Sequence, residues 1–342
     1  MNYFSIIIPV FNNTSEEIDR CLQSIFNQTY NHYEIIIVDD GSNKECAAYL
    51  DNYKRNNISI YHKTNEGVSN ARNYGLKFSH GNYITFVDID DIISKTMLEE
   101  ADKILSENDV DILYGLVEYV HDISSIELNR DLLNNFKLLS LEDKKMLHTH
   151  MYHLGMKQFW RGNSYVSRGP VAKILKKSVM DNNLFNASLI FGEDEEWNFR
   201  ILESQNYNMA IAYHTWYYYI FTPSSTLHRF RLNFIELSEQ RLKTMQSFIW
   251  NTNDQVELMK EGFSVIKEIF YRYYFSKENK QSFFSINEDF NQLLRREIWK
   301  SIFRFDLVNK FDIALMIKYL LLQLRILPLI LYLYNITNKK VR

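Results

Sequence analysis

The sequence is poor in the residues that mark disulfide-rich, fibrous and disordered chains. Its 342 residues include 2 Cys, 4 Pro and 10 Gly, whereas hydrophobic residues make up 46%. Two cysteines, Cys21 and Cys46, cannot form a disulfide framework, and they fit a protein of a reducing compartment. Low Pro and Gly contents argue against collagen-like and low-complexity chains. A sizeable core is therefore available, and the length suits one large domain or two modest ones.

Two further patterns are not found along the first apolar runs: that of a secretory signal peptide and that of a glycine-rich phosphate-binding loop. The stretch from Met1 to Pro9 has no basic residues and only a short apolar run, so we expect no secretory signal peptide. Neither G-x-G-x-x-G nor G-x-x-x-x-G-K-[ST] follows any of the first apolar runs. We therefore expect no phosphate binding on a glycine-rich loop, so that a metal ion would have to neutralise any phosphates that this chain binds.

Strand-like and helix-like segments alternate over the first 90 residues. The apolar, strand-like runs are 5–9, 33–39, 58–61 and 83–87, and the helix-like stretches are 16–28, 45–56 and 68–78. In the first helix Ile18, Leu22 and Ile25 recur at helical spacing. The preceding Thr14 and Glu17 resemble a capping box. This alternation predicts a mainly parallel α/β sheet in three layers.

Two of these predicted strands end in carboxylates. Asp39 and Asp40 follow the second strand, and Asp88, Asp90 and Asp91 follow the fourth. Clustered Asp side chains repel one another and are costly to desolvate, so core packing does not explain them. Hard divalent cations take oxygen ligands, and open α/β sheets bind ligands at the carboxyl ends of their strands. We predict that Asp88 and Asp90 hold a metal and, through it, the phosphates of a sugar nucleotide, whereas Asp39 and Asp40 can accept hydrogen bonds from a uracil N–H or from ribose hydroxyls. The alternative is that both are Asp-rich turns.

Four motifs in a fixed order carry a resemblance to a known family. They are Ile-Ile-Pro-Val-Phe-Asn at 7–12, Ile-Ile-Val-Asp-Asp-Gly-Ser at 36–42, Asn-Glu-Gly-Val-Ser-Asn-Ala-Arg-Asn at 65–73 and Phe-Val-Asp-Ile-Asp-Asp at 86–91. Through about the first 100 residues, the sequence resembles the family 2 glycosyltransferases of the GT-A fold. The resemblance implies a GT-A catalytic domain over 1–230, inverting chemistry, a nucleotide-diphosphate sugar as donor, and Mn²⁺ or Mg²⁺ as cofactor.

The resemblance also implies roles for individual positions. Those that would bind the sugar nucleotide are Pro9, Phe11, Asp39, Asp40, Asn65, Ser69, Arg72, Asp88 and Ile89. Those that would hold the metal are Asp90 and Asp88, and Asp91 could share this role. After a tyrosine-rich segment, His228 and Arg229 would contact the leaving diphosphate from a closing loop.

A second acidic motif, Glu193-Asp194-Glu195-Glu196, lies about 100 residues beyond the first. An inverting transfer needs one base to deprotonate the acceptor hydroxyl, and it needs no second carboxylate as nucleophile. The resemblance implies that Asp194 is this base and that Glu193 orients the acceptor or the base. The alternative is that the acids suit the N-terminus of a helix.

Three histidines, His148, His150 and His153, invite a metal-site interpretation. Their spacings of two and three do not place all three on one helical face, and no carboxylate completes a known ligand pattern. We therefore predict ordinary surface or packing histidines.

The region 231–342 is predicted to be helical and carries most of the positive charge. From Arg295 to Arg342 there are ten Lys or Arg against three acids, a net +7 that leaves −10 for the remainder. The apolar stretch 313–334 is interrupted by Lys318, Gln323, Arg325 and Pro328. We expect a helix that lies in an anionic membrane interface, with Lys318 and Arg325 on one face, rather than a span. Packing within this region or in an oligomer is the alternative.

The resemblance thus implies transfer of a hexose or N-acetylhexosamine from a UDP-sugar to a saccharide or lipid-linked saccharide acceptor of the lipopolysaccharide, O-antigen or capsule type. We expect a peripheral protein on the cytoplasmic face of the inner membrane, without a nucleic-acid partner. One alternative is a metal-dependent nucleotidyltransferase, which usually carries a glycine-rich, basic loop after its first strand. Another is a non-catalytic, membrane-associated protein that binds sugar nucleotides.

Overall fold

The computed structural model describes residues 1–54, 56–126, 135–204, 206–221, 232–276 and 278–339. The chain divides into two compact units, Met1–Thr222 and Pro223–Arg342. The sequence-based boundary lies after residue 230, within the segment 222–231 that is outside the described residues.

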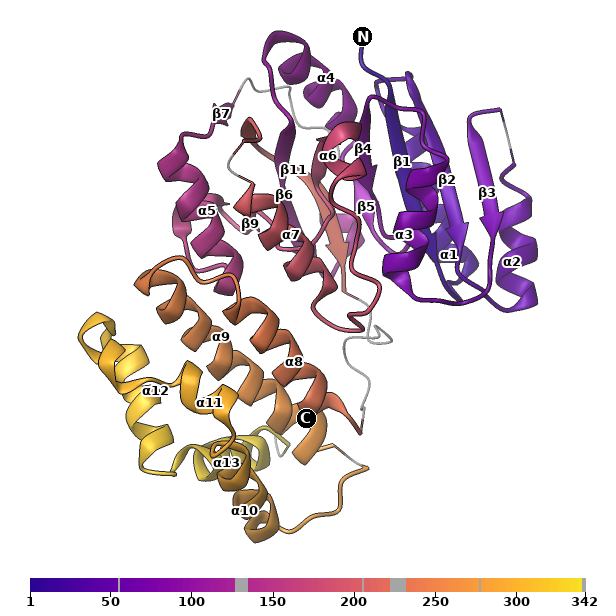
Figure 1. Ribbon diagram of the computed structural model, residues 1–342. Helices are drawn as coiled ribbons and strands as arrows, with labels where there is room; N and C mark the ends of the chain where they lie inside the picture. The colour runs from indigo at the N-terminus through magenta and orange to yellow at the C-terminus, as the bar shows by residue number, and fades with distance from the viewer. Residues whose placement is uncertain (55, 127–134, 205, 222–231, 277, 340–342) are drawn as a thin grey trace. The chain divides into compact units, whose positions relative to one another are not determined.

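The first unit is built on one twisted sheet (Figure 1). Four parallel strands begin it in the order β3-β2-β1-β4: β1 (Phe4–Val10), β2 (Tyr33–Asp39), β3 (Ile58–His62) and β4 (Tyr83–Phe86). The sheet continues from β4 through β10 (Lys173–Lys176), β6 (Ile112–Val120), β11 (Met209–Ile220) and β5 (Ile92–Ile93). Strand β10 is antiparallel to both neighbours, whereas β6 and β11 are parallel to each other. The predicted mainly parallel α/β sheet is confirmed.

Three short strands extend this sheet. Strand β7 (Phe136–Leu138) pairs with β11, and β9 (Ser164–Tyr165) joins β8 (Trp160–Arg161) to β6. The helices of the unit are α1 (Ser15–Phe26), α2 (Lys44–Asp51), α3 (Val68–Lys77), α4 (Met97–Glu107), α5 (Leu141–His153), α6 (Lys177–Asp181) and α7 (Glu193–Glu203). Single 3-10 turns occur at Ile123–Ser125 and Lys157–Phe159.

Helix α1 begins as the sequence predicts. The Thr14 hydroxyl accepts a hydrogen bond from the backbone N–H of Glu17, and the Glu17 carboxylate accepts one from the N–H of Thr14. This capping box satisfies two donors that the first turn of a helix leaves free. The buried face of the helix carries Ile18, Leu22 and Ile25.

The sheet is covered on both faces, as a three-layer fold requires. Side chains of α1, α2 and α4 share a hydrophobic cluster with Ile6 and Ile8, which point to one face of β1. On the other face α3 approaches β1 closely at Gly75, where an added Cβ would lie 2.6 Å from Cγ2 of Ile7. Because Arg72 is three residues earlier on the same helix, this close packing fixes its height above the sheet.

The second unit is helical. Its elements are α8 (Phe234–Gln246), α9 (Thr252–Ile269), a π-helical turn (Phe270–Tyr274), α10 (Phe283–Leu293), α11 (Glu297–Ile302), a 3-10 segment (Phe305–Lys310), α12 (Ile313–Gln323) and α13 (Leu327–Lys339). Trp299, Phe270 and Phe290 are among its fully buried side chains. Residues 294–296 separate α10 from α11.

The predicted continuous helix over 313–334 is also interrupted. Arg325 adopts the left-handed region with φ of 58°, and α12 and α13 are bent by 102° across this break. Lys318 and Arg325 therefore do not share one helical face, contrary to the prediction. Within the described ranges no one helix has the length and apolarity of a membrane span, and α12 with α13 meets those criteria only as this bent pair.

Candidate active site

The loops that follow β1, β2 and β3 meet at the carboxyl edge of the sheet. The backbone N–H of Asn12 donates to Oγ of Ser42 at 2.9 Å, and the N–H of Asn43 donates to Oδ1 of Asn12 at 2.8 Å. Gly41 has φ of 78°, and an added Cβ there would lie 2.6 Å from the backbone nitrogen of Asn65. A glycine is therefore required where the second and third loops touch.

The two acids after β2 are buried and bind the third loop. Asp39 accepts hydrogen bonds from the N–H of Ser42 and faces Nδ1 of His62 at 2.7 Å. The hydrogen bond to Asp39 raises the pKa of His62 above its ordinary value. Asp40 accepts from Nζ of Lys63 at 2.6 Å and from the N–H of Gly67 at 2.7 Å. Both carboxylates thus shape this edge of the sheet.

Arg72 connects the two acidic motifs that the sequence placed 106 residues apart. Its Nη2 donates to Oδ1 of Asp88 at 3.0 Å, and its Nη1 donates to Oδ1 of Asp194 at 2.8 Å. The guanidinium is buried and lies over the ring of Phe185, 5.3 Å from the ring centroid. Asp88 and Asp194 keep about a third of their side-chain surface exposed, so both remain accessible to a ligand.

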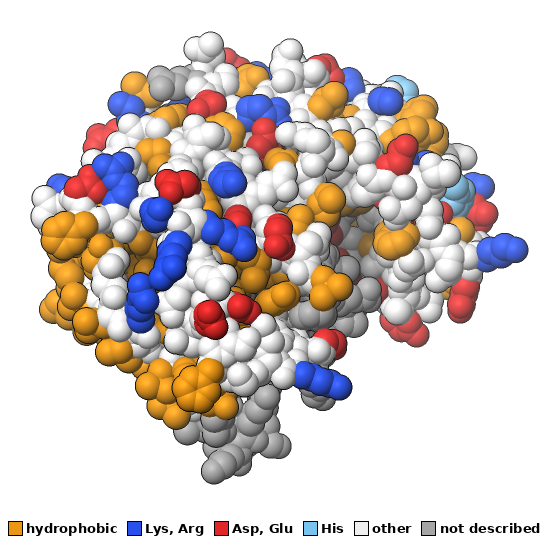
Figure 2. All heavy atoms as spheres, turned by 60° about the horizontal axis from the view of Figure 1, so that its bottom comes forward, with side chains coloured by type: hydrophobic (Ala, Val, Ile, Leu, Met, Phe, Trp, Pro, Cys, Tyr) orange, Lys and Arg blue, Asp and Glu red, His pale blue; other side chains and the backbone are white. Residues whose placement is uncertain are grey.

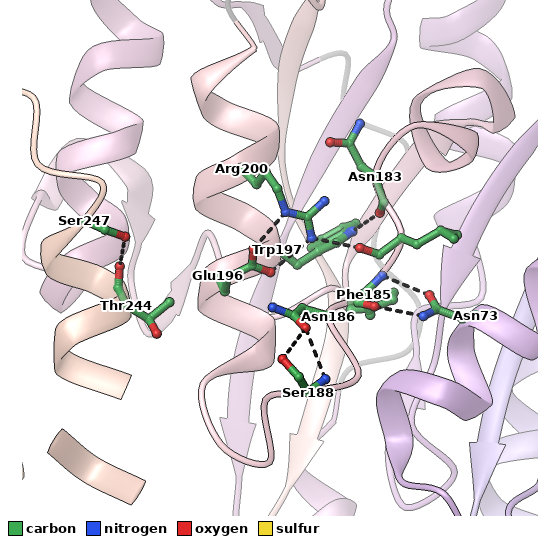
Figure 3. A network of polar contacts seen from close by, with 11 residues as sticks. Asn73, Asn183, Phe185, Asn186, Ser188, Glu196, Trp197, Arg200, Thr244 and Ser247 are labelled. Carbon is green, nitrogen blue, oxygen red and sulfur yellow. Dashed lines mark hydrogen bonds and ion pairs between the residues drawn. The ribbon is translucent and has the colours of Figure 1, made fainter. Parts of the chain in front are cut away.

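A second network fixes the position of α7 and hence of Asp194 (Figure 3). Asn73, next to Arg72, exchanges two hydrogen bonds with the backbone of Phe185, at 2.8 and 2.9 Å. From α7, Nε1 of Trp197 donates to the carbonyl of Asn183 at 2.8 Å. The ring of Trp197 stacks on that of Phe185, with centroids 4.8 Å apart. The segment 183–185 therefore joins α3 to α7 rigidly.

Asp91 belongs to the core. It is fully buried, its Oδ2 accepts from the Tyr217 hydroxyl at 2.6 Å, and its Oδ1 accepts from the N–H of Ile220 at 2.9 Å. The same hydroxyl accepts from the N–H of Asp88 at 3.1 Å. With both oxygens used inside the protein, Asp91 positions the motif and is not available to share a metal.

Asp88 and Asp90 are the carboxylates of this motif that could hold a metal. Burial, followed by the negative charge of Asp88, raises the pKa of Asp90 to about 6. The raised pKa means that the negative charge of Asp90 is unfavourable in this buried, acidic surrounding. A bound cation would stabilise that charge. Among the described residues no group of three or more His, Cys, Asp or Glu is arranged to hold a metal. Two carboxylates completed by substrate phosphates and water are a usual set for Mg²⁺.

Glu193 and Asp194 open α7 side by side. Burial and the neighbouring charge of Asp194 raise the pKa of Glu193 to about 8. Burial also raises the pKa of Asp194, while the charge of Arg72 opposes the shift. A carboxylate whose pKa is raised toward neutral is a better proton acceptor than an ordinary one, as a general base requires.

The remaining predicted residues are spread over the same edge. Phe11 is half exposed, Asn65 is exposed, and Pro9 is buried at the end of β1. Ser69 is buried, and its hydroxyl has no hydrogen-bond partner among the described residues. Ile89 packs into the hydrophobic core, so only its backbone can face a donor. His228 and Arg229 lie outside the described residues.

The histidines behave as predicted for packing residues. His148 and His150 on α5 are fully buried, and Nε2 of His150 lies 3.1 Å from the carbonyl oxygen of Val166. Burial lowers the pKa of His150 to about 4, so it is neutral.

Sequence reasoning missed Lys173. This lysine on β10 is buried, and its ammonium donates to the carbonyls of Ser167 and Gly169. Burial lowers its pKa to about 7. An added Cβ at Gly169 would lie 3.7 Å from Oδ2 of Asp194, so Lys173 holds the backbone that borders the proposed base. Its only sequence signature is a lysine within an apolar run, which is too common to be informative.

Comparisons with known proteins point to one family over the first part of the chain. A model of the family described as glycosyl transferase family 2 matches residues 5–166, slightly less than half of the chain. Glycosyltransferase GlyG of Streptococcus pneumoniae is 35% identical over 114 residues, which are 32% of this chain and 38% of GlyG. The minor teichoic acid biosynthesis protein GgaB of Bacillus subtilis is 39% identical over 121 residues, 33% of this chain and 13% of GgaB. The match thus spans 38% of the length of GlyG and only 13% of the length of GgaB.

Solved structures show the same fold over most of the chain. S. aureus TarS 1-349 in complex with UDP-GlcNAc superposes with a TM-score of 0.62 at 18% identity. The superposition covers 95% of this chain and 88% of that one. Over residues 5–166, which include the four ordered motifs and the parallel strands, the chain matches the model of glycosyl transferase family 2.

Proposed function

We propose that this protein is an inverting glycosyltransferase that moves a hexose or N-acetylhexosamine from a UDP-sugar to a saccharide acceptor. The observation that carries the proposal is the pair of hydrogen bonds by which Arg72 joins Asp88 to Asp194. This pair of contacts supports a donor site at the end of β4 next to a base at the start of α7. The UDP-GlcNAc complex of the structural neighbour TarS supports the choice of donor.

In this mechanism Asp194 accepts the proton of the acceptor hydroxyl. The hydroxyl oxygen bonds to the anomeric carbon from the face opposite the diphosphate, while the bond from that carbon to the diphosphate oxygen breaks and UDP leaves. One displacement inverts the anomeric configuration, so no covalent sugar–enzyme intermediate is needed. Glu193 stands beside Asp194 and would orient the acceptor or the base.

The donor would lie along the carboxyl ends of β1, β2 and β4. Strands β2 and β4 are both neighbours of β1, so their ends are about 10 Å apart, since adjacent strands are separated by about 4.8 Å. The nucleoside would contact Phe11 and Asp39, and the diphosphate would approach Asp88 and Asp90. A Mn²⁺ or Mg²⁺ ion held by these two carboxylates would neutralise charge on the leaving diphosphate.

We further propose that the acceptor belongs to a cell-surface glycopolymer and that the reaction takes place on the cytoplasmic face of the inner membrane. The name of GgaB places that relative in teichoic acid synthesis, and the basic C-terminal region of this chain suits an anionic surface. The acceptor classes are then lipid-linked saccharides of the lipopolysaccharide, O-antigen, capsule or teichoic acid type.

A panel of UDP-sugars with Mn²⁺ or Mg²⁺ tests the proposal. The full chain should release UDP from at least one donor in a metal-dependent way when an acceptor is supplied. Asp194→Asn should lower kcat by about 10²–10⁴, the usual contribution of a general base, while donor binding measured by calorimetry persists. Glu195→Gln, in the same helical turn, is the matched control. Equal turnover by Asp194→Asn would exclude Asp194 as the base.

A further inference from the structure

A cleft of about 740 Å³ lies within the second unit, remote in sequence from the catalytic motifs. Four of the residues that line it are basic, Arg295, Lys300, Arg304 and Arg325, whereas Asp306 is the one acidic residue among them. Its walls include the buried rings of Trp299 and Tyr319. Because these rings are buried, the cationic side chains at the rim decide what the cleft can bind, and they are suited to an anionic group.

Two of the four cations are already paired within the protein. Nζ of Lys300 lies 2.8 Å from Oε1 of Glu297, and Arg304 forms an ion pair with Asp306. Arg295 and Arg325 are exposed and have no side-chain hydrogen bond or ion pair among the described residues. These two guanidinium groups are therefore available to a ligand.

Helix α12, whose end lines the cleft, is apolar on two opposite faces. Leu315, Tyr319 and Leu322 are buried against the second unit. The opposite face carries an apolar stripe at positions i, i+4, i+7 and i+11, which are Ile313, Ile317, Leu320 and Leu324. These four side chains are 49–82% exposed. A stripe of this spacing forms one continuous surface along a helix.

Helix α13 and the rim of the cleft extend this apolar surface. On α13 the exposed side chains are Leu329, Ile330, Leu333 and Tyr334. Phe305, on the rim of the cleft, is 77% exposed. Figure 2 shows hydrophobic side chains gathered on the left of its view, beside a row of Lys and Arg side chains. Exposed apolar area on this scale usually marks an interaction surface.

We propose that this surface binds an anionic phospholipid bilayer, with the cleft taking a phosphate-bearing headgroup while the exposed face of α12 enters the boundary of the acyl chains. Apolar side chains partition into that boundary, and each Lys or Arg beside it adds electrostatic attraction. The proposal names the surface and the lipid class for the membrane contact proposed above. It does not depend on the transfer reaction.

Charge and polarity favour a bilayer over two other occupants. A second copy of the chain would bring two regions of net +7 together, which like-charge repulsion opposes. A soluble phosphate-containing polymer would satisfy Arg295 and Arg325 but would leave the α12 stripe in water. Only an anionic lipid surface uses both features.

Vesicle flotation of the full chain tests the proposal. The protein should float with vesicles of equal parts phosphatidylglycerol and phosphatidylcholine, and it should stay at the bottom with phosphatidylcholine alone. Arg295→Gln/Arg325→Gln should weaken partitioning about 30-fold, because each basic residue near an anionic membrane contributes about fivefold. Lys243→Gln/Lys267→Gln removes the same charge from exposed positions of α8 and α9 and should weaken it far less.

Leu320→Ser/Leu324→Ser should likewise weaken flotation, and Phe284→Ser, which replaces an exposed apolar residue of α10, is its control. Circular dichroism must show that each variant is folded, and UDP release with a soluble acceptor should match that of the wild type. Failure to float with anionic vesicles, or equal flotation of the cleft variant and its charge control, would overturn the proposal. A dimer that the Leu320→Ser/Leu324→Ser variant dissociates, without flotation of the wild type, would assign the face to a second copy.

Discussion

Nη1 of Arg72 and Oδ1 of Asp194 lie 2.8 Å apart although 122 residues separate them in the sequence. The contact holds the proposed base beside the carboxylate of Asp88, to which the same guanidinium also donates. Arginine suits this position because its planar fork offers several fixed donors and stays charged at all relevant pH values. Arg72 thus holds the two carboxylates together, in addition to the network through Asn73 and Trp197 that positions α7.

Replacing Arg72 should affect catalysis more than donor binding. Arg72→Lys keeps the charge but cannot bridge both carboxylates in the same plane, so we expect kcat to fall about 10²-fold, as for a 1 Å displacement of a reacting group. Steady-state kinetics of UDP release would measure this. Lys77→Met, which removes a cation from the same helix, is the control. Unchanged kcat in Arg72→Lys would show that the bridge does not position the base.

Glu193 should make the protein less stable as the pH rises. Its pKa is about 8 in the folded protein and 4.5 ordinarily, so the folded state retains a proton that the unfolded chain releases. Its contribution to stability is therefore fully present below about pH 4.5 and is lost progressively up to about pH 8. As the pH rises through this window, the unfolding temperature of Glu193→Gln should increase relative to that of the wild type. Glu203→Gln, at the exposed end of α7, is the control; a difference independent of pH would contradict the shift.

Removal of the hydroxyl should change the stability of the protein differently at two buried tyrosines of the sheet, Tyr217 and Tyr114. Tyr217→Phe removes a donor to buried Asp91 and an acceptor for the N–H of Asp88, so we expect a loss of about 1–3 kcal/mol in the free energy of unfolding. The Tyr114 hydroxyl is buried without a hydrogen-bond partner among the described residues, so Tyr114→Phe should be neutral or stabilising. Urea denaturation would measure both, and equal effects would refute the assignment of Asp91 to the core.

Asp90→Asn should weaken the binding of Mn²⁺ in the presence of UDP. Loss of a residue that only supports a metal ligand usually lowers the metal affinity ~10–100-fold. Asp90→Asn removes a proposed direct ligand, so the affinity for Mn²⁺ should fall by at least as much. Electron paramagnetic resonance of free Mn²⁺ would measure it. Asp109→Asn, just before β6 at the opposite end of the parallel strands, serves as the control. Full Mn²⁺ affinity in Asp90→Asn would remove Asp90 from the metal site.

His62 should contribute to stability mainly in acid. Its pKa is raised by the hydrogen bond to Asp39, so the contribution is fully present below the unfolded pKa of about 6.5 and is lost as the pH rises through the higher folded value. Because His62 is more than a third exposed, the effect should stay below about 1 kcal/mol. The unfolding temperature of His62→Asn should therefore fall below that of the wild type more at pH near 5.5 than near 8.5.

Much of the fold could be predicted from local pattern. Alternating apolar strands and amphipathic helices gave β1 to β4 and α1 to α3, and the capping box located the start of α1. The acids after β2 and β4 could be assigned to one edge because parallel strands present their carboxyl ends together. These features depend on short-range spacing, which the sequence displays directly.

Other features depended on contacts between distant segments. Asp90 and Asp91 are adjacent in the sequence, yet Asp91 is buried because Tyr217 and the N–H of Ile220 satisfy it, whereas Asp90 keeps partly compensated charge. The insertion of antiparallel β10 between β4 and β6 has no local signature either.

The sequence by itself determined the family resemblance, the parallel sheet and the residue types at its edge. Only the tertiary structure decided that Arg72 links Asp88 to Asp194 and that the C-terminal apolar stretch breaks at Arg325 into two helices. The physical reason is that helical and strand periods are set by neighbouring residues, whereas an ion pair across 122 positions or a bend between helices depends on how the packed elements meet.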